Sequence, residues 1–205
     1  MMTRFLTTLA AGTSLLALAG MAHADPVVGE PAPAFEASTA TGEAIALSDF
    51  SGETVILEWT NHGCPYVQKH YDGQNMQELQ ANAASDGITW IQIISSAPGK
   101  QGHVSAEEAL ALNQSRGAAP AHVVLDPEGT IGRAYEAATT PHMYIIDAEG
   151  TLRYAGAIDD QPSARSSSLE GAHNYVTAAL DAMEAGEPID PDQTVAYGCN
   201  VKYPG

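Results

Sequence analysis

Cys64 is the residue whose type and surroundings point most directly to chemistry. It follows an apolar run at residues 55–57 and a short polar turn, and Pro65 comes immediately after it. Proline favours the first position of a helix, because its missing N–H would have no partner there. Cys64 would then lie at or beside the N-cap, where unpaired backbone N–H groups and the helix dipole lower the pKa of a thiol. The pattern predicts a nucleophilic thiolate; the alternative is an inert cysteine packed in the core.

Three histidines are further candidates for chemistry around Cys64. They are His62, His70 and His142, and a cysteine together with histidines is a ligand set for copper or zinc. The alternative is that these histidines are exposed or hydrogen-bonded side chains without a ligand. A metal site is the less favoured interpretation, with His62, Cys64 and His142 as its candidate ligands.

The elements that position these residues alternate between strands and helices. We expect a hairpin within residues 27–50, followed by strands at 55–59, 88–94, 122–125, 141–147 and 151–155, and helices at 64–84, 105–115, 130–135 and 169–185. Pro141 should be the first residue of its strand, because proline cannot sit inside a central ladder. This order predicts an α/β fold with a mixed central sheet flanked by helices and an N-terminal β-hairpin.

The composition is compatible with one domain and restricts the partners. The chain has 205 residues, with 8 basic against 25 acidic side chains and a net charge of −17. That length suits a single domain with a sizeable core. The strong negative charge argues against nucleic acid or an anionic lipid surface as a partner.

Residues 1–24 have the pattern of a secretory signal peptide. Arg4 supplies the positive charge, an apolar stretch follows, and Ala22-His23-Ala24 forms a small-x-small cleavage site before Asp25. A membrane anchor is the weaker alternative, because the stretch is short and carries several Thr and Ser residues. We therefore expect a protein in the bacterial periplasm or secreted, without stable membrane insertion after cleavage, in a compartment where disulfides persist.

Several sequence motifs resemble those of a known family. They are Val-Gly-x-Pro-Ala-Pro-x-Phe with Leu-Ser-Asp-Phe-x-Gly, Ile-Ile-Asp-x-x-Gly-x-Leu-Arg-Tyr-x-Gly, Asn-His-Gly-Cys-Pro-Tyr-Val, and the tail motif Gly-Cys-x-x-Lys-aromatic. Together they resemble the redoxin family of alkyl hydroperoxide reductases and thiol-specific antioxidants, in its peroxiredoxin-like group, over residues 27–185. The resemblance implies a thioredoxin-like domain at 25–188 followed by a tail at 189–205. It also implies a thiol oxidoreductase that needs no organic cofactor and takes electrons from a thiol donor not identified by the sequence.

The resemblance assigns roles to the two cysteines. Cys64 would be the nucleophile, and Cys199, the only other cysteine, could resolve an oxidised Cys64 from a tail that looks mobile. The alternative is a permanent disulfide, which would stabilise the fold by roughly 4–5 kcal/mol in the chain-entropy model. Val67 stands where thioredoxins have their second cysteine, so a local Cys-x-x-Cys dithiol is absent.

The chain also departs from the peroxiredoxin pattern near Cys64. Asn61 occupies the place of the usual Thr, with Thr60 one residue earlier, and the usual Arg is missing at residues 140–142. Thr60, Asn61 or His62 are the candidate helpers, and Arg133 or Lys100 the candidate replacements for the Arg. Pro141 resembles the cis-proline of thioredoxins, beside which an extended substrate docks. The substrate could thus be a peroxide, or a protein or small-molecule disulfide.

A protein of another class fits some of the same features. A non-catalytic redoxin-fold binding or copper-handling module would carry a structural disulfide, although the Cys-x-x-x-Cys pair of copper-delivering relatives is missing. Elsewhere, Trp59 is expected to pack in the core, and Asp159-Asp160 to form a solvated turn.

Overall fold

A five-stranded sheet forms the centre of the computed structural model, which describes residues 26–205. Its strands lie in the order β5-β4-β3-β7-β8: β5 (His122–Leu125), β4 (Thr89–Ile94), β3 (Val55–Trp59), β7 (His142–Ile146) and β8 (Leu152–Gly156). Strands β3, β4 and β5 are parallel, whereas β7 and β8 run antiparallel to their neighbours. The predicted α/β architecture with a mixed sheet is confirmed. The predicted signal peptide, residues 1–24, lies outside the described residues.

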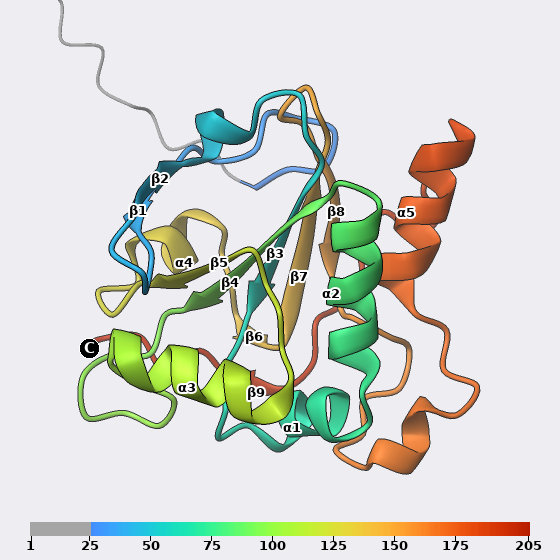
Figure 1. The fold of residues 1–205 in the computed structure, drawn as a ribbon. Helices are drawn as coiled ribbons and strands as arrows, with labels where there is room; N and C mark the ends of the chain where they lie inside the picture. The colour runs from blue at the N-terminus through green and yellow to red at the C-terminus, as the bar shows by residue number, and fades with distance from the viewer. Residues whose placement is uncertain (1–25) are drawn as a thin grey trace, which may run out of the picture.

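Helices and a small hairpin cover the two faces of this sheet (Figure 1). One face packs against α1 (Pro65–Asp72), α2 (Asn75–Ser85), α3 (Ala106–Arg116) and α5 (Tyr175–Ala185). The other face packs against the hairpin of β1 (Glu36–Ser38) and β2 (Ala44–Ala46), the 3-10 turn η1 (Leu47–Phe50) and α4 (Thr130–Ala134). Within residues 26–205, no helix combines the length and the apolar character needed to cross a bilayer.

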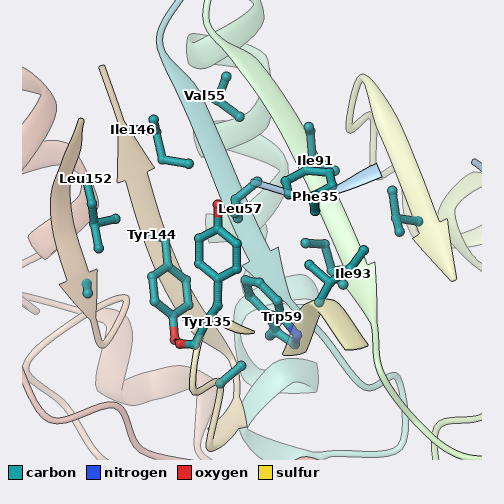
Figure 2. Close-up of a cluster of buried hydrophobic side chains, with 14 of the residues drawn as sticks. Phe35, Val55, Leu57, Trp59, Ile91, Ile93, Tyr135, Tyr144, Ile146 and Leu152 are labelled. Atoms are coloured by element: carbon teal, nitrogen blue, oxygen red, sulfur yellow. The ribbon is translucent and has the colours of Figure 1, made fainter. Parts of the chain in front are cut away.

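The core on the hairpin side is built around Trp59, the last residue of β3 (Figure 2). Its ring lies 5.3 Å from that of Tyr135 and 5.1 Å from that of Tyr144, and its indole N–H donates to Ser95 Oγ at 3.0 Å. Trp59 is fully buried, as predicted. The last residue before the active-site turn is thus fixed by packing on every side.

The opposite face of β3 carries a fully buried carboxylate, Glu58. It accepts hydrogen bonds from the Tyr71 hydroxyl at 2.8 Å, the Trp90 indole N–H at 3.0 Å and the Gln80 amide at 3.2 Å. These donors come from α1, β4 and α2, and they satisfy a charge that would be costly to bury unpartnered. Glu58 therefore ties the strand that leads into the active site to the two helices that follow it.

The helix predicted at residues 64–84 is instead two helices. It breaks after Asp72, where Gly73 caps α1 and Gln74 adopts a left-handed conformation with φ of 63°. The prediction of one helix was wrong because apolar residues recur at helical spacing on both sides of the break. The turn tilts the chain, so that α1 lies beneath the end of the sheet and α2 lies along its face (Figure 1).

Two other predicted boundaries also differ. The last helix begins at Tyr175 rather than at 169, because the Asn174 side chain caps it by accepting from the Thr177 amide at 3.1 Å. Pro141 does not begin a strand but separates β6 (Thr139–Thr140) from β7.

The C-terminal segment is held against the domain, contrary to the mobile tail that we expected. It runs along the lower end of the sheet, where β9 (Cys199–Asn200) pairs with β6 (Figure 1). Beyond β9, the Val201 amide donates to Ala138 O at 3.0 Å, and the Tyr203 hydroxyl donates to Ala137 O at 2.7 Å. The tail thus ends on the same edge of the molecule as the end of β3.

Candidate active site

Cys64 is the N-cap of α1, directly after the turn that leaves β3, as its sequence context predicts. Its backbone is extended, with φ of −84° and ψ of 122°, and Pro65 is the first helical residue. The antiparallel register pairs Trp59 of β3 with His142 of β7. This pairing brings Pro141 and Thr140 beside the turn that carries Cys64.

Asn61 shapes that turn from inside the protein. Its side-chain oxygen accepts from the Gly63 amide at 2.9 Å, its side-chain nitrogen donates to Gln101 O at 3.3 Å, and its backbone oxygen accepts from the Cys64 amide at 3.0 Å. Asn61 is 1% exposed and Thr60 is 2% exposed. The Thr60 hydroxyl is buried without a hydrogen-bond partner. Of the three candidate helpers, Thr60 and Asn61 are therefore buried, whereas His62 is partly exposed. Asn61 holds the turn through its hydrogen bonds.

The two cysteines meet at the paired strands β6 and β9. Thr140 pairs with Cys199 across these strands, and the Cys64 thiol donates to Thr140 O at 3.1 Å. Cys64 has no exposed surface, whereas Cys199 is partly exposed. Cys199 packs against the cluster of buried side chains that contains Cys64, and both cysteines are free in this structure. Thr140 therefore links the two cysteines, with the tail in the position that the structure shows.

Their surroundings give the two thiols unequal acidities. Burial raises the pKa of Cys64, but hydrogen bonds from the Cys199 thiol and from the Val67 and Cys199 amides outweigh burial and lower it overall. The bond that Cys64 donates to Thr140 O favours the thiol and does not reverse this order. Burial and the neighbouring Cys64 raise the pKa of Cys199 to about 11. Of the two thiols, Cys64 is therefore the one that loses its proton first.

Pro141 and the edge beside it are arranged differently from the expected docking site. The Thr140–Pro141 peptide bond is cis, as the resemblance implied. The strand edge before it, Thr139–Thr140, already pairs with Asn200 and Cys199 of the same chain. An extended substrate therefore finds this edge occupied while the tail is in place.

The three candidate histidines, all within residues 26–205, have separate surroundings. Burial lowers the pKa of His142 to about 4, and the ring of His142 faces Tyr144, with Nδ1 3.2 Å from the hydroxyl. His70 is fully buried and contacts Asn75 at 2.9 Å. His62 lines a shallow surface pocket of about 510 Å³ with His103. Across residues 26–205, no group of three or more His, Cys, Asp or Glu side chains is placed to hold a metal ion.

Asp159 overturns the prediction of a solvated turn. Asp159 is 2% exposed and accepts from Lys69 Nζ at 3.1 Å, and the Lys69 side chain is fully buried as well. Asp160, by contrast, is exposed as expected. The Tyr197 hydroxyl donates to Asp159 Oδ1, and it accepts from Lys69 Nζ at 2.9 Å. Sequence reasoning missed this cluster, because charged residues are almost never fully buried unless paired, and the pairing is not local.

The cations proposed to replace the missing Arg have other surroundings. The Arg133 guanidinium donates to Glu128 O at 2.8 Å and to Pro204 O at 2.9 Å, and it lies over the Tyr203 ring at 4.8 Å. Arg133 thus holds the end of the tail, and Lys100 is exposed on a loop. The basic residue that acts on the cysteine pair is Lys202, which opposes the rise in the Cys199 pKa.

This arrangement can perform two-electron thiol chemistry. A thiolate-prone sulfur at a helix N-terminus is a nucleophile, and a protonated thiol beside it can supply a proton and then form a disulfide. Among residues 26–205, the side chains around the two cysteines do not include a group of three that could hold a metal ion.

Comparison with known proteins finds a matching family and similar solved structures. The AhpC/TSA family matches residues 28–155. An uncharacterized conserved protein from Geobacillus kaustophilus is 24% identical, with a TM-score of 0.74 over 87% of this chain and 93% of that one. A hypothetical protein from Sinorhizobium meliloti 1021 is 22% identical, with a TM-score of 0.73 over 87% of this chain and 96% of that one.

A third similar structure carries a functional description. It is a secreted disulfide oxidoreductase from Mycobacterium tuberculosis, 17% identical, with a TM-score of 0.53 over 72% of this chain and 95% of that one. At these identities the likeness shows the fold alone, which is thioredoxin-like. No curated protein matches the sequence.

Proposed function

The chain belongs to the AhpC/TSA family, and from that premise we propose that it is an exported thiol oxidoreductase that cycles between a dithiol and a Cys64–Cys199 disulfide. Cys64 is the nucleophile and Cys199 is the resolving residue. No organic cofactor takes part in the cycle, since the sulfur atoms carry the electrons.

One observation carries the proposal, namely that the two thiols lie in contact with their acidities pushed apart. Cys64 sits at a helix N-cap with a lowered pKa, and Cys199, which pairs with Thr140 beside it, has a raised one. Pairs of titratable groups whose environments separate their pKa values mark the acid and the base of a reaction. A thiol pair that formed only a permanent structural disulfide would not require different pKa values for its two thiols.

With a hydroperoxide as oxidant, the cycle has three balanced steps. The Cys64 thiolate attacks the terminal peroxide oxygen, the O–O bond breaks, and the leaving alkoxide takes a proton to give an alcohol and a Cys64 sulfenic acid. The Cys199 thiol then attacks the Cys64 sulfur, and water leaves as the disulfide forms. Two thiols of an external donor reduce the disulfide and are themselves oxidised to a disulfide.

The site favours a small oxidant over an extended protein. Residues 199–200 occupy the strand edge beside Pro141, so that a protein disulfide must first displace the tail. Peroxiredoxins stabilise the leaving oxygen with an Arg that this chain lacks at residues 140–142. A modest peroxidase rate, or exchange with a small disulfide, is consistent with both features.

The proposal includes export, which rests on the sequence of residues 1–24. Arg4, the apolar stretch and the Ala22-His23-Ala24 site together support cleavage before Asp25. The periplasm or the outside of a bacterial cell would then be the compartment. There the donor would be a thiol protein or a small thiol that works in oxidising surroundings.

Stopped-flow oxidation of the reduced protein tests this function. We expect hydrogen peroxide and a small disulfide to convert Cys64 and Cys199 into an intramolecular disulfide, with a peroxide rate constant well below the diffusional ceiling of about 10⁸–10⁹ M⁻¹s⁻¹. Cys64→Ser should abolish both reactions. Cys199→Ser should leave the first step intact, and the Cys64 sulfenic acid or mixed disulfide should then accumulate.

Two outcomes would contradict the proposal. The first is a Cys64→Ser variant that reacts with peroxide as fast as the wild type. The second is a disulfide that survives mild reductant and whose formation does not follow added oxidant. That second result would favour the non-catalytic module with a structural disulfide.

A further inference from the structure

The structure assigns Tyr197 as the residue that positions Cys199: its hydroxyl, held by the buried Lys69–Asp159 pair, fixes Cys199 against Cys64 and closes access to Cys64. We propose that opening this contact is the step that admits a reactant to the buried sulfur. This inference rests on the proposed function only in taking Cys64 and Cys199 as partners.

The contact is unusual because it places a buried charged pair beneath a surface segment. The Lys69 and Asp159 side chains are 0% and 1% exposed, and they come from α1 and from the loop after β8. Lys69 also donates to Gln161 O at 2.8 Å. The Tyr197 hydroxyl donates to Asp159 and accepts from Lys69, so it completes the hydrogen bonding of both charges. Buried charges without hydrogen-bond partners are strongly destabilising. Docking of the tail therefore stabilises the buried Lys69–Asp159 pair.

The same contact links the tail to the helix that carries the nucleophile. Lys69 and His70 lie on α1, whose N-cap is Cys64, and His70 Nε2 lies 3.4 Å from the Tyr197 hydroxyl. The Tyr66 ring, also on α1, packs edge-on against Tyr197 at 5.8 Å. Tyr197, two residues before Cys199 in the chain, is thus held against α1, the helix that positions Cys64.

Gly198 shows how closely the tail approaches the site. Its φ is +143°, and a Cβ atom built on it would lie 2.0 Å from Thr140 O. Thr140 is the residue that pairs with Cys199 and accepts from the Cys64 thiol. Any side chain at position 198 must therefore push the tail away from β6, which links tail docking directly to the surroundings of Cys64.

The tail is also held on the far side of Cys199. Val201 donates to Ala138 O at 3.0 Å, and Ala97 donates to Lys202 O at 2.8 Å. Cys199 therefore lies in a short bridge between two fixed points. Because Cys64 has no exposed surface and Cys199 has some, release at the Tyr197 end uncovers Cys64 while the other end remains attached.

Alkylation of Cys64 in the reduced protein measures this access without any turnover. The rate is determined by peptide mapping near pH 9, above the ordinary thiol pKa of about 8.5, so that access rather than ionisation limits it. Tyr197→Phe keeps the ring and removes the hydroxyl. Loss of a hydrogen bond to a charged group should raise the population of the open tail, and with it the Cys64 alkylation rate, by about tenfold or more. The disulfide equilibrium with glutathione should shift toward the dithiol by a similar factor.

Gly198→Ala tests the same docking by a clash instead of a lost bond, and the same increase is expected. Tyr135→Phe is the matched control, because it removes a buried hydroxyl that donates to Pro33 O at 2.7 Å on the other side of the sheet. It should leave the Cys64 alkylation rate unchanged. Circular dichroism checks that each variant is folded. If Tyr197→Phe does not fold, Tyr66→Ala replaces it, since Tyr66 packs on Tyr197 outside the buried pair.

The results separate this inference from the proposed function. A wild-type alkylation rate in Tyr197→Phe, or in Tyr66→Ala if that variant replaces it, overturns the role of Tyr197, whatever the Gly198→Ala variant does. An equal increase in Tyr135→Phe also overturns it, because the effect would then follow general destabilisation. Failure of the proposed function would appear elsewhere, as an absence of oxidation by peroxide or a small disulfide.

Discussion

At the scale of single residues, the thiol pair shows how neighbours divide one charge. Both sulfurs are desolvated, which alone would raise both pKa values. The hydrogen bond from Cys199 stabilises the anion on Cys64 and, by the same contact, stabilises the proton on Cys199. The Val67 amide of the first helical turn and the Cys199 amide of the tail act on the Cys64 side alone. These hydrogen bonds together lower the pKa of Cys64, whereas burial and the neighbouring Cys64 raise the pKa of Cys199 to about 11, so Cys199 stays protonated at neutral pH.

The pH dependence of Cys64 alkylation tests this division. We expect an inflection below the ordinary thiol value of about 8.5 in the reduced wild-type protein, because the thiolate is the reactive form and its pKa is lowered. Cys199→Ala removes the donor and should move the inflection upward. Cys199→Ser keeps a hydroxyl donor and should move it less. An inflection that is the same in all three proteins would show that Cys199 does not influence the acidity of Cys64.

Asp159 and Asp160 make a matched pair for measuring the cost of burial. Asp159→Asn leaves the Lys69 ammonium buried without its counter-charge, and we expect a loss of about 3–5 kcal/mol in the free energy of unfolding. Asp160→Asn, at the adjacent exposed position, should cost much less. Urea denaturation of the two variants provides the comparison. Equal losses would mean that the Lys69–Asp159 pair has no special place in the stability of the fold.

These residues also show what local sequence can and cannot predict. The N-cap position of Cys64 was predictable, because a following proline and a preceding apolar strand lie within a few residues of it. The burial of Asp159 was not, because its partner Lys69 is 90 residues away and its hydrogen-bond donor Tyr197 is 38 residues away. A charged side chain is read as exposed until tertiary structure supplies its partner.

At the scale of elements, the break between α1 and α2 orients the active-site helix. Two apolar stripes on either side of Gly73 predict one continuous helix, and the structure overrides them with a left-handed Gln74. Adding a Cβ to Gly73 would bring it 2.3 Å from Leu169 Cδ1, so this turn is also packed closely against the loop before α5. The break was not predictable from periodicity, which reports the buried face but not the continuity of a helix.

The strain at Gln74 leads to a stability prediction. Glycine adopts the left-handed region without a Cβ penalty, so Gln74→Gly should raise the free energy of unfolding by up to about 1 kcal/mol. Asn82→Gly places the same residue at an exposed position within α2 and should lower the free energy of unfolding by about 0.3 kcal/mol, since Asn is itself a poor helix former. Thermal or urea unfolding of both variants checks the opposite signs. A destabilised Gln74→Gly would show that the Gln74 side chain contributes more than its backbone costs.

At the scale of the whole molecule, the C-terminal segment returns to the region around Cys64, where β9 pairs with β6. The sheet, its mixed order and its flanking helices were predictable, since apolar strands and amphipathic helices alternate clearly and the motifs resemble a known family. The return of the tail was not, because strands β6 and β9 have two residues each and carry no periodic signal. Their pairing arises from contacts between segments about 60 residues apart, such as Thr140 Oγ1 with Cys199 O at 3.4 Å.

The buried cluster that holds the tail should also govern how the molecule responds to acid. Burial, helped by Lys69 and opposed by Asp159, lowers the pKa of His70 from 6.5 to about 4. Around its ring, Asn75 contacts Nδ1 at 2.9 Å, and the Tyr197 hydroxyl lies 3.4 Å from Nε2. Between pH 6.5 and 4 the unfolded chain therefore binds a proton at His70 that the folded protein excludes. By linkage, stability falls as the pH is lowered through this window.

We therefore expect His70→Gln to lose less stability than the wild type between about pH 7 and pH 4, by on the order of 2–3 kcal/mol. Urea denaturation across this range measures the difference between the two proteins. His173→Gln, at an exposed histidine, is the control and should follow the wild-type curve. Parallel curves for His70→Gln and the wild type would mean that the folded protein accepts a proton at His70. In that case the buried pair, the tyrosine and the tail above them would have to be open to solvent at mildly acidic pH.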